Sequence, residues 1–126
     1  MLKNSKAFSG YSVDDMTIAM SFYGETLGLD VSEDNGLMTL HLGSGTKVLV
    51  YVKPNHAPAT YTVLNFPVKS VDQTVTALKE RGVRFESYSM PGLETDSNDV
   101  CRDAGGPVIA WFRDPAGNII SVLEER

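Results

Sequence analysis

The sequence predicts an α+β protein made of two tandem strand-helix-strand-strand-strand modules, residues 1–54 and 60–126, joined by a linker at residues 53–60. Near the C-terminus, apolar runs rich in β-branched and aromatic residues flank the turn Asp-Pro-Ala-Gly-Asn, which is typical of a tight antiparallel hairpin over residues 109–124. A weaker hairpin pattern lies at residues 38–51, around Gly-Ser-Gly. Because a strand-helix-strand pattern precedes each hairpin, the two halves repeat one plan.

The first module opens with a partly alternating segment at residues 6–13, which predicts a strand. The acidic pair at 14–15 suits a helix N-cap and first turn. Apolar side chains then recur at helical spacing, at Met16, Ala19, Met20, Tyr23 and Leu27. Gly28 suits the left-handed position that ends a helix, so we expect a helix of about three turns. A strand from residue 29 to 32 and a turn at 34–36 lead into the first hairpin.

The second module repeats this order. Residues 61–68 predict a strand, in which Pro67 belongs at a sheet edge or where no ladder donor is needed. Ser70 to Gln73 has the S-x-x-Q form of a capping box, and Gly82 marks the end of the helix that follows. The apolar face of this helix consists of Val71, Val75 and Leu78. Residues 83–88 alternate as a strand before the final hairpin.

A long segment from residue 89 to 106 separates that strand from the hairpin, and it is rich in glycine and in acidic and amide residues. Loops of this length are either disordered or close over a site, and both alternatives stay open. We expect residues 99–102 to form a short piece of strand. Cys101 lies there beside Arg102, which could activate its thiol, although a lone cysteine is more commonly a small buried apolar residue.

The composition of the chain argues against several classes of function. A chain of 126 residues is long enough to bury a core as one domain, and its single cysteine excludes an intrachain disulfide framework. The net charge of −5 and scattered basic residues argue against nucleic-acid binding. No apolar run approaches membrane-spanning length, and the N-terminus does not resemble a signal peptide, so we expect a cytoplasmic protein that does not contact membranes.

Two motifs resemble signatures of the vicinal oxygen chelate superfamily, which includes glyoxalase I, bleomycin-resistance proteins, fosfomycin-resistance enzymes and extradiol dioxygenases. The first is Asp15 with Phe22-Tyr23 and Leu27-Gly28-Leu29, and the second is the run from Phe112 to Asn118. The resemblance covers nearly the whole chain. It implies two βαβββ modules whose curved mixed sheets surround a cavity, and it implies a homodimer. It says less about activity, since one scaffold serves many chemistries.

The resemblance also places metal ligands on the concave faces, near the start of the first strand and on the last strand of each module. The corresponding positions here are Phe8, Leu49, Val63 and Ser121. If the count of these positions is shifted by one residue, the corresponding residues are Ser9, Val50, Leu64 and Val122. Divalent ions need several converging imidazole or carboxylate ligands, so we expect neither a metal nor another cofactor. Metal-dependent isomerase and dioxygenase mechanisms are therefore in doubt.

The same counts put an apolar surface with a few polar groups on the concave face, which is typical of a small-molecule site. The candidate ligand-binding residues are Phe8, Ser12, Leu49, Tyr51, Val63, Asn65, Trp111 and Ser121. The alternative is that these side chains only pack the two sheets together. Trp111 and Tyr51 could stack on a flat aromatic ligand, or they could be interface aromatics.

Catalytic residues are not identified by any motif. Histidine is the residue type best suited to proton transfer near neutral pH, so His41 and His56 are, with Tyr51, the candidates for acid–base chemistry, although surface or packing roles suit both histidines as well. We expect a glyoxalase/bleomycin-resistance-like protein, free of metal, that binds a small apolar or aromatic molecule between its sheets. Two alternatives stay open: a metal-dependent lyase, isomerase or dioxygenase with noncanonical ligands, and a metal-independent acid–base enzyme.

Overall fold

The computed structural model describes residues 1–102 and 106–124. The chain forms two compact units, residues 1–57 (unit 1) and 58–126 (unit 2). Each unit contains a mixed β-sheet and one main helical segment, so the predicted α+β class is confirmed. Within the described residues, no helix has the length and apolar character needed to cross a membrane.

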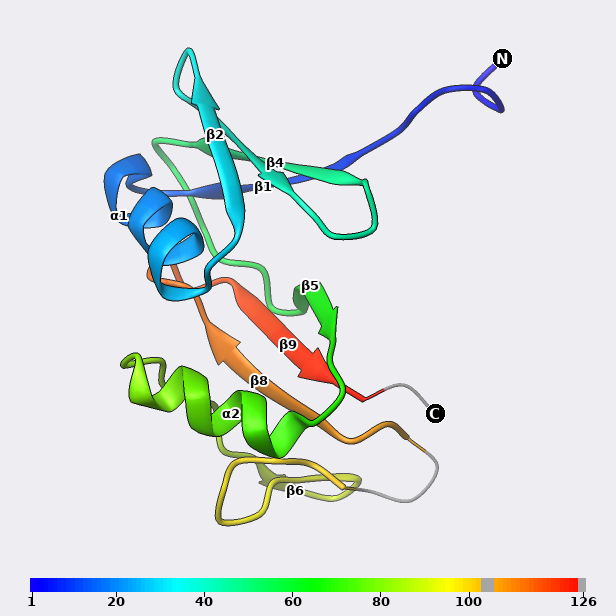
Figure 1. Ribbon diagram of the computed structural model, residues 1–126, viewed down its shortest axis with the longest axis vertical. Coiled ribbons are helices and arrows are strands. Elements are labelled where there is room, and N and C mark those ends of the chain that lie inside the picture. Colours follow the sequence, from blue (N-terminus) through cyan, green and yellow to red (C-terminus); the bar gives the residue numbers. More distant parts are fainter. Residues whose placement is uncertain (103–105, 125–126) are drawn as a thin grey trace. The chain divides into compact units, whose positions relative to one another are not determined.

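Unit 1 follows the predicted order of elements (Figure 1). Its sheet has the strand order β1-β4-β3-β2, in which β1 is parallel to β4 and the other neighbours are antiparallel. The tight turn between β2 and β3 uses positive φ angles at Asn35 and Gly36, as hairpin turns of this type require. The elements are β1 (Ser9–Val13), α1 (Met16–Ser21), η1 (Phe22–Thr26), β2 (Asp30–Asp34), β3 (Leu37–His41) and β4 (Lys47–Val52).

The helical segment of unit 1 differs from the predicted three-turn α-helix. Asp15 caps it as expected, because its Oδ1 accepts a hydrogen bond from the Ile18 amide at 3.0 Å. After six residues, however, the helix widens into a π-helix, where the Leu27 amide donates to the Phe22 carbonyl at 2.9 Å. Gly28 then ends the segment with a φ of +73°.

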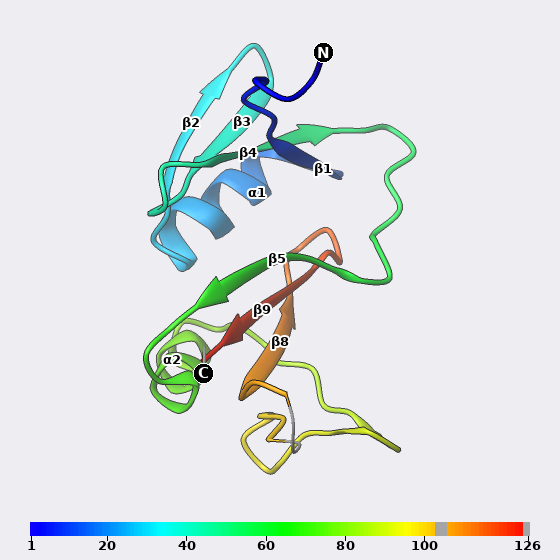
Figure 2. The same cartoon turned by 90° about the vertical axis from the view of Figure 1, so that its right-hand side faces the viewer.

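The two faces of the unit 1 sheet differ in burial. One face is covered by α1 and η1, as Figure 2 shows, and there the hydroxyl of buried Tyr11 donates to that of Tyr23 at 2.8 Å. This core also contains Val13, Ala19, Met38, Leu40, Val48 and Val50. Side chains alternate along a strand, so the residues between these project from the other side, the open face of unit 1.

The sheet of unit 2 has the order β5-β9-β8, with β5 parallel to β9 and β8 antiparallel to it. Pro67 lies on β5, at the edge of this sheet, which confirms its predicted place. Ser70 caps α2 by accepting from the Gln73 amide, and Val71 and Val75 are fully buried. The elements are β5 (Thr62–Pro67), α2 (Val71–Glu80), β6 (Ser89–Met90), β7 (Leu93–Glu94), β8 (Ile109–Arg113) and β9 (Ile119–Leu123).

The strand predicted at residues 83–88 is reduced to a short contact with β8. Phe85 forms a single bridge with Phe112, and the Glu86 amide donates to the Trp111 carbonyl at 2.8 Å. Beyond that point Tyr88 bonds through its amide and carbonyl to Thr95 instead. The chain therefore leaves β8 and enters the β6–β7 hairpin.

Two predicted strand positions also differ. The first strand begins at Ser9 rather than residue 6, so Phe8 precedes β1, and its side chain is 55% exposed. In β5 the register shifts between Thr62, which pairs with Ile119, and Leu64, which pairs with Ile120. Val63 is the extra residue of this bulge, so Thr62 takes the position beside Ile119 that even alternation assigns to Val63.

The segment after β7 is attached to the rest of unit 2 rather than extended. Cys101 is buried and bridges both Thr95 and Ile109, so the expected piece of strand is present as isolated pairings. Ion pairs join it to α2, from Lys79 to Asp99 at 3.1 Å and from Arg102 to Asp72 at 2.5 Å. The long segment at residues 89–106, which the sequence leaves open as either a disordered loop or a lid over a site, includes residues 103–105, which lie outside the described residues.

Candidate ligand-binding faces

The face of the unit 2 sheet away from α2, here called the open face of unit 2, carries a row of three predicted ligand-binding residues. Trp111 on β8 pairs with Ser121 on β9, and Ser121 pairs with Asn65 on β5, so the three side chains share one face. The Ser121 hydroxyl donates to Asn65 Oδ1 at 2.5 Å and is fully buried. Asn65 is exposed and its Oδ1 is bonded to Ser121, so its amide nitrogen is the group that can donate to a ligand.

Tyr88 extends this row beyond Trp111. The two rings meet edge to face, with centroids 5.5 Å apart and planes at 82°. Burial raises the pKa of the Tyr88 phenol above its ordinary value, the negative charge of Glu86 raises it further, and Arg113 acts in the opposite direction. Trp111 is thus held by a neighbouring ring and remains partly exposed.

The turn between β8 and β9 sets the register of these two strands and so determines which residues pair in this row. Asp114 is buried, and its Oδ1 accepts from the amides of Ala116 and Asn118 at 3.0 and 2.8 Å. These hydrogen bonds build the turn predicted for the run Asp-Pro-Ala-Gly-Asn. Gly117 adopts a φ of +90°, which completes the turn at low cost.

The open face of unit 1 brings together three other predicted residues. Ser12 on β1 pairs with Tyr51 on β4, and Gly10 pairs with Leu49. Leu49 and Ser12 are half-buried, whereas Tyr51 is 36% exposed. These side chains form a mixed apolar and polar surface on the side of the sheet away from the helix.

Two serine–histidine pairs lie in unit 1. Ser12 Oγ is 2.6 Å from His56 Nδ1, and the His56 amide is fixed by the Lys53 carbonyl at 3.0 Å. Ser32 Oγ is 2.8 Å from His41 Nε2, in an exposed position on β2 and β3. Each predicted histidine candidate therefore has a hydroxyl partner, and the Ser12–His56 pair is the better shielded from water.

The positions that correspond to metal ligands do not fit a divalent ion. They carry Phe8 and Leu49 in unit 1 and Val63 and Ser121 in unit 2, and at the bulge Thr62 rather than Val63 pairs with Ile119. Ser121 Oγ is already bonded to Asn65. Within the described residues, no three His, Cys, Asp or Glu side chains gather in a way that could hold an ion. This donor set offers no imidazole or carboxylate, so it does not suit zinc, nickel, manganese or iron.

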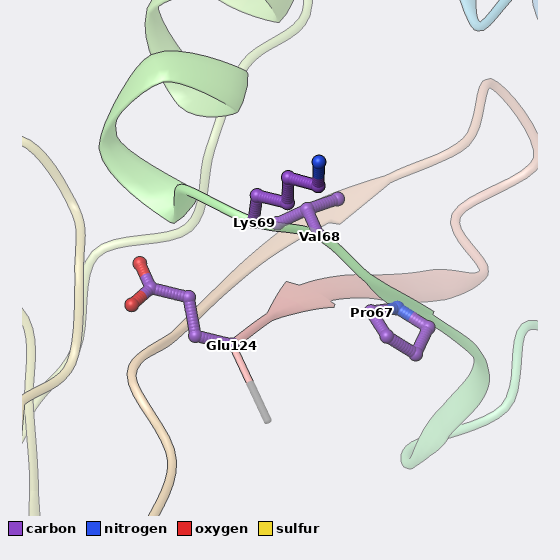
Figure 3. Close-up of a pocket in the computed structure, with 4 residues that line it drawn as sticks. All are labelled: Pro67, Val68, Lys69 and Glu124. Carbon is purple, nitrogen blue, oxygen red and sulfur yellow. The ribbon is translucent and has the colours of Figure 1, made fainter. Parts of the chain in front are cut away.

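A separate pocket of about 400 Å³ lies at the start of α2, lined by Pro67, Val68, Lys69 and Glu124 (Figure 3). The Glu124 carboxylate points toward α2, where its Oε2 accepts from the Val71 amide at 2.8 Å. This carboxylate already occupies the amide that an anionic ligand would use. None of the predicted ligand-binding residues lines this pocket, so it is not the candidate site.

Sequence reasoning missed three features of these faces. Tyr88 could have been found, because alternation from buried Val83 and Phe85 places it on the opposite side. The Ser12–His56 contact spans 44 residues, and no local pattern indicates it. The bulge that pairs Thr62 rather than Val63 with Ile119 also has no signature in the sequence.

Comparisons with known proteins agree with this architecture. The family model for the Glyoxalase/Bleomycin resistance protein/Dioxygenase superfamily matches residues 8–122. A superfamily member from Sphaerobacter thermophilus DSM 20745 is 24% identical, over 94% of this chain and 97% of that chain, with a TM-score of 0.71. Comparison with curated proteins finds no match.

Two further structures are similar in fold. The fosfomycin resistance protein FosX from Listeria monocytogenes is 13% identical, over 95% of this chain and 92% of that chain, with a TM-score of 0.71. A bleomycin-binding protein complexed with bleomycin is 20% identical, over 95% of this chain and 98% of that chain, with a TM-score of 0.70. At these identities the likeness concerns the fold.

Proposed function

This chain belongs to the Glyoxalase/Bleomycin resistance protein/Dioxygenase superfamily, and we propose that it is a metal-independent member that binds a small, largely apolar or aromatic molecule. The observation that carries the proposal is the row formed by Trp111, Ser121 and Asn65. It offers a flat aromatic surface beside an amide donor, and one of its residues stands where a metal ligand would be needed. A structural relative that binds bleomycin gives the proposal a precedent on this fold.

The expected contacts follow from these groups. An aromatic ring of the ligand stacks on Trp111. The edge-to-face contact with Tyr88 holds the Trp111 ring in place. The Asn65 amide donates to a carbonyl or ether oxygen of the ligand, while Ser121 fixes the orientation of that amide. Binding therefore needs no charge on the ligand and no metal.

Fluorescence of Trp111 tests this function directly, because it is the sole tryptophan of the chain. We expect a panel of neutral aromatic carbonyl compounds to change its emission saturably in chelator-treated protein. Asn65→Ala should weaken binding about tenfold, corresponding to loss of one hydrogen bond worth roughly 1.4 kcal/mol. Asn55→Ala, in the exposed connector, is the matched control. Absence of saturable binding across the panel would refute the proposal.

A second candidate function is metal-independent acid–base catalysis, which the Ser12–His56 contact favours. His56 could accept a proton through Ser12 or from a substrate, with Tyr51 next to Ser12 in the sheet. For any compound found to be turned over, His56→Ala should abolish turnover and His41→Ala should leave it unchanged. Equal losses in both variants, or none, would argue against this alternative.

The proposed functional form is a cytoplasmic homodimer. Exposed apolar side chains that support an additional interface include Ile18, Val52 and Tyr61, the last 70% exposed. Sedimentation equilibrium should return twice the chain mass of 13.7 kDa. A monomer at micromolar concentration would refute this part of the proposal.

A further inference from the structure

The open face of unit 1 can be mapped as three rows of side chains, because the register of its four strands is continuous. Residues that pair across neighbouring strands project from the same face. Each row crosses the sheet from β2 through β3 and β4 to β1. The first row ends at Phe8, the residue just before β1. The first row is Asp30, His41, Lys47 and Phe8; the second is Ser32, Thr39, Leu49 and Gly10; the third is Asp34, Leu37, Tyr51 and Ser12.

The β4 side of this face combines a cation with apolar surface. Lys47 Nζ lies 5.1 Å from the centre of the Phe8 ring, which holds the ammonium at the end of the first row. Within residues 1–102 and 106–124, no carboxylate lies within 4.0 Å of that ammonium. The charge of Lys47 is therefore available to a bound molecule.

The rows beside Lys47 are suited to an apolar body. Gly10 contributes no side chain, and a Cβ there would stand 3.1 Å from the Leu49 carbonyl oxygen. Leu49 forms the centre of the surface, and Tyr51 ends it with a partly exposed ring. Tyr51 is four positions beyond Lys47 along the strand, a span of about 13 Å that accommodates one or two fused rings.

The acidic side chains of this face lie on its far side. Asp30 and Asp34 are on β2, two strands away from β4, which places that edge roughly 10 Å from Lys47. An anionic group is therefore favoured at the Lys47 end and disfavoured at the β2 edge. His41 lies between them and can add a hydrogen-bond donor.

We propose that the open face of unit 1 binds an aromatic carboxylate, with the carboxylate at Lys47 and Phe8 and the rings over Gly10 and Leu49 toward Tyr51. The inference goes beyond the proposed function, because it assigns a charged ligand class to a surface that does not include Trp111. It needs neither a metal nor a chemical step.

Two probes of the same shape test the proposal: 2-naphthoate, which is anionic, and 2-naphthamide, which is neutral. Calorimetry on the full chain should give at least tenfold tighter binding of the naphthoate. Lys47→Gln should remove that preference, and Lys47→Arg should retain it because the positive charge is kept. Lys53→Gln, an exposed lysine just beyond β4, is the matched control and should change nothing.

Amide chemical shifts show which face is involved. We expect naphthoate to shift the signals of Gly10, Leu49 and Tyr51. Equal affinity for the two probes, or equal effects of Lys47→Gln and Lys53→Gln, would overturn the inference. Neither outcome would refute the proposed function, because that function is tested separately by the change in Trp111 emission with neutral compounds.

Discussion

Asp114 and Asn118 are joined by three hydrogen bonds across the final turn. Asp114 Oδ1 accepts from the Asn118 amide at 2.8 Å, Oδ2 accepts from Asn118 Nδ2 at 3.0 Å, and the Asp114 amide donates to the Asn118 carbonyl at 2.9 Å. Both residues are buried. This pair fixes how β8 and β9 meet, and so it determines that Trp111 lies beside Ser121.

Removing the Asp114 carboxylate should destabilise the protein. Asp114→Ala leaves buried amides unpaired, and we expect a loss of about 2–4 kcal/mol in the free energy of unfolding. Denaturant unfolding measures it. Asp34→Ala, beside the other tight turn but exposed, should change stability by less than about 0.5 kcal/mol. Similar effects of the two substitutions would contradict the role given to Asp114.

The attachment of residues 96–102 should weaken in acid. Hydrogen bonding by Arg102 is the main cause that lowers the pKa of Asp96, and the Val100 and Asn98 amides add to it. A carboxyl whose pKa is lower in the folded state stabilises that state above its unfolded pKa of about 3.9 and loses this effect as pH falls through the folded value.

Hydrogen exchange of the Val100 amide, which donates to Asp96 Oδ1 at 3.0 Å, measures this effect. Its protection should decrease below about pH 4, near the ordinary pKa of an aspartate. Asp96→Asn should make the protection lower and independent of pH in that range. A wild-type profile that stays flat down to acid unfolding would count against the assignment.

The Tyr88 phenol should ionise at a higher pH than an ordinary tyrosine. Desolvation is the main cause that raises its pKa, and Glu86 adds to it. A phenol whose pKa is raised by folding stabilises the protein below its unfolded pKa of about 10 and loses that effect as pH rises through the folded value. Ultraviolet titration should show a late-ionising tyrosine that Tyr88→Phe removes; an unchanged titration curve in this variant would contradict the placement of Tyr88.

The sequence predicts those parts of the fold whose causes are local. Asp15 and Ser70 cap their helices, Gly28 ends a helix, and Pro67 lies at a sheet edge, each because the chemistry of one residue restricts its neighbours. The final hairpin follows from its turn residues in the same way. Alternation then separates the helix-covered face from the open face in both units.

The differences arise where distant partners compete for the same backbone. Tyr88 bonds Thr95 rather than continuing along β8, so the predicted strand at 83–88 shortens. The bulge at Val63 depends on pairing with β9, more than fifty residues away in the chain. The contact of Ser12 with His56 likewise requires the folded connector. Neither composition nor periodicity carries this information.

The central claim is that the chain binds its ligand without a metal. The most direct measurement is the affinity of an aromatic compound that changes Trp111 emission, taken in chelator-treated protein and again with added zinc, nickel, manganese or iron(II). We expect equal affinities and no stoichiometric metal after purification without chelator. Binding that is lost on chelation and restored by one equivalent of metal would contradict it.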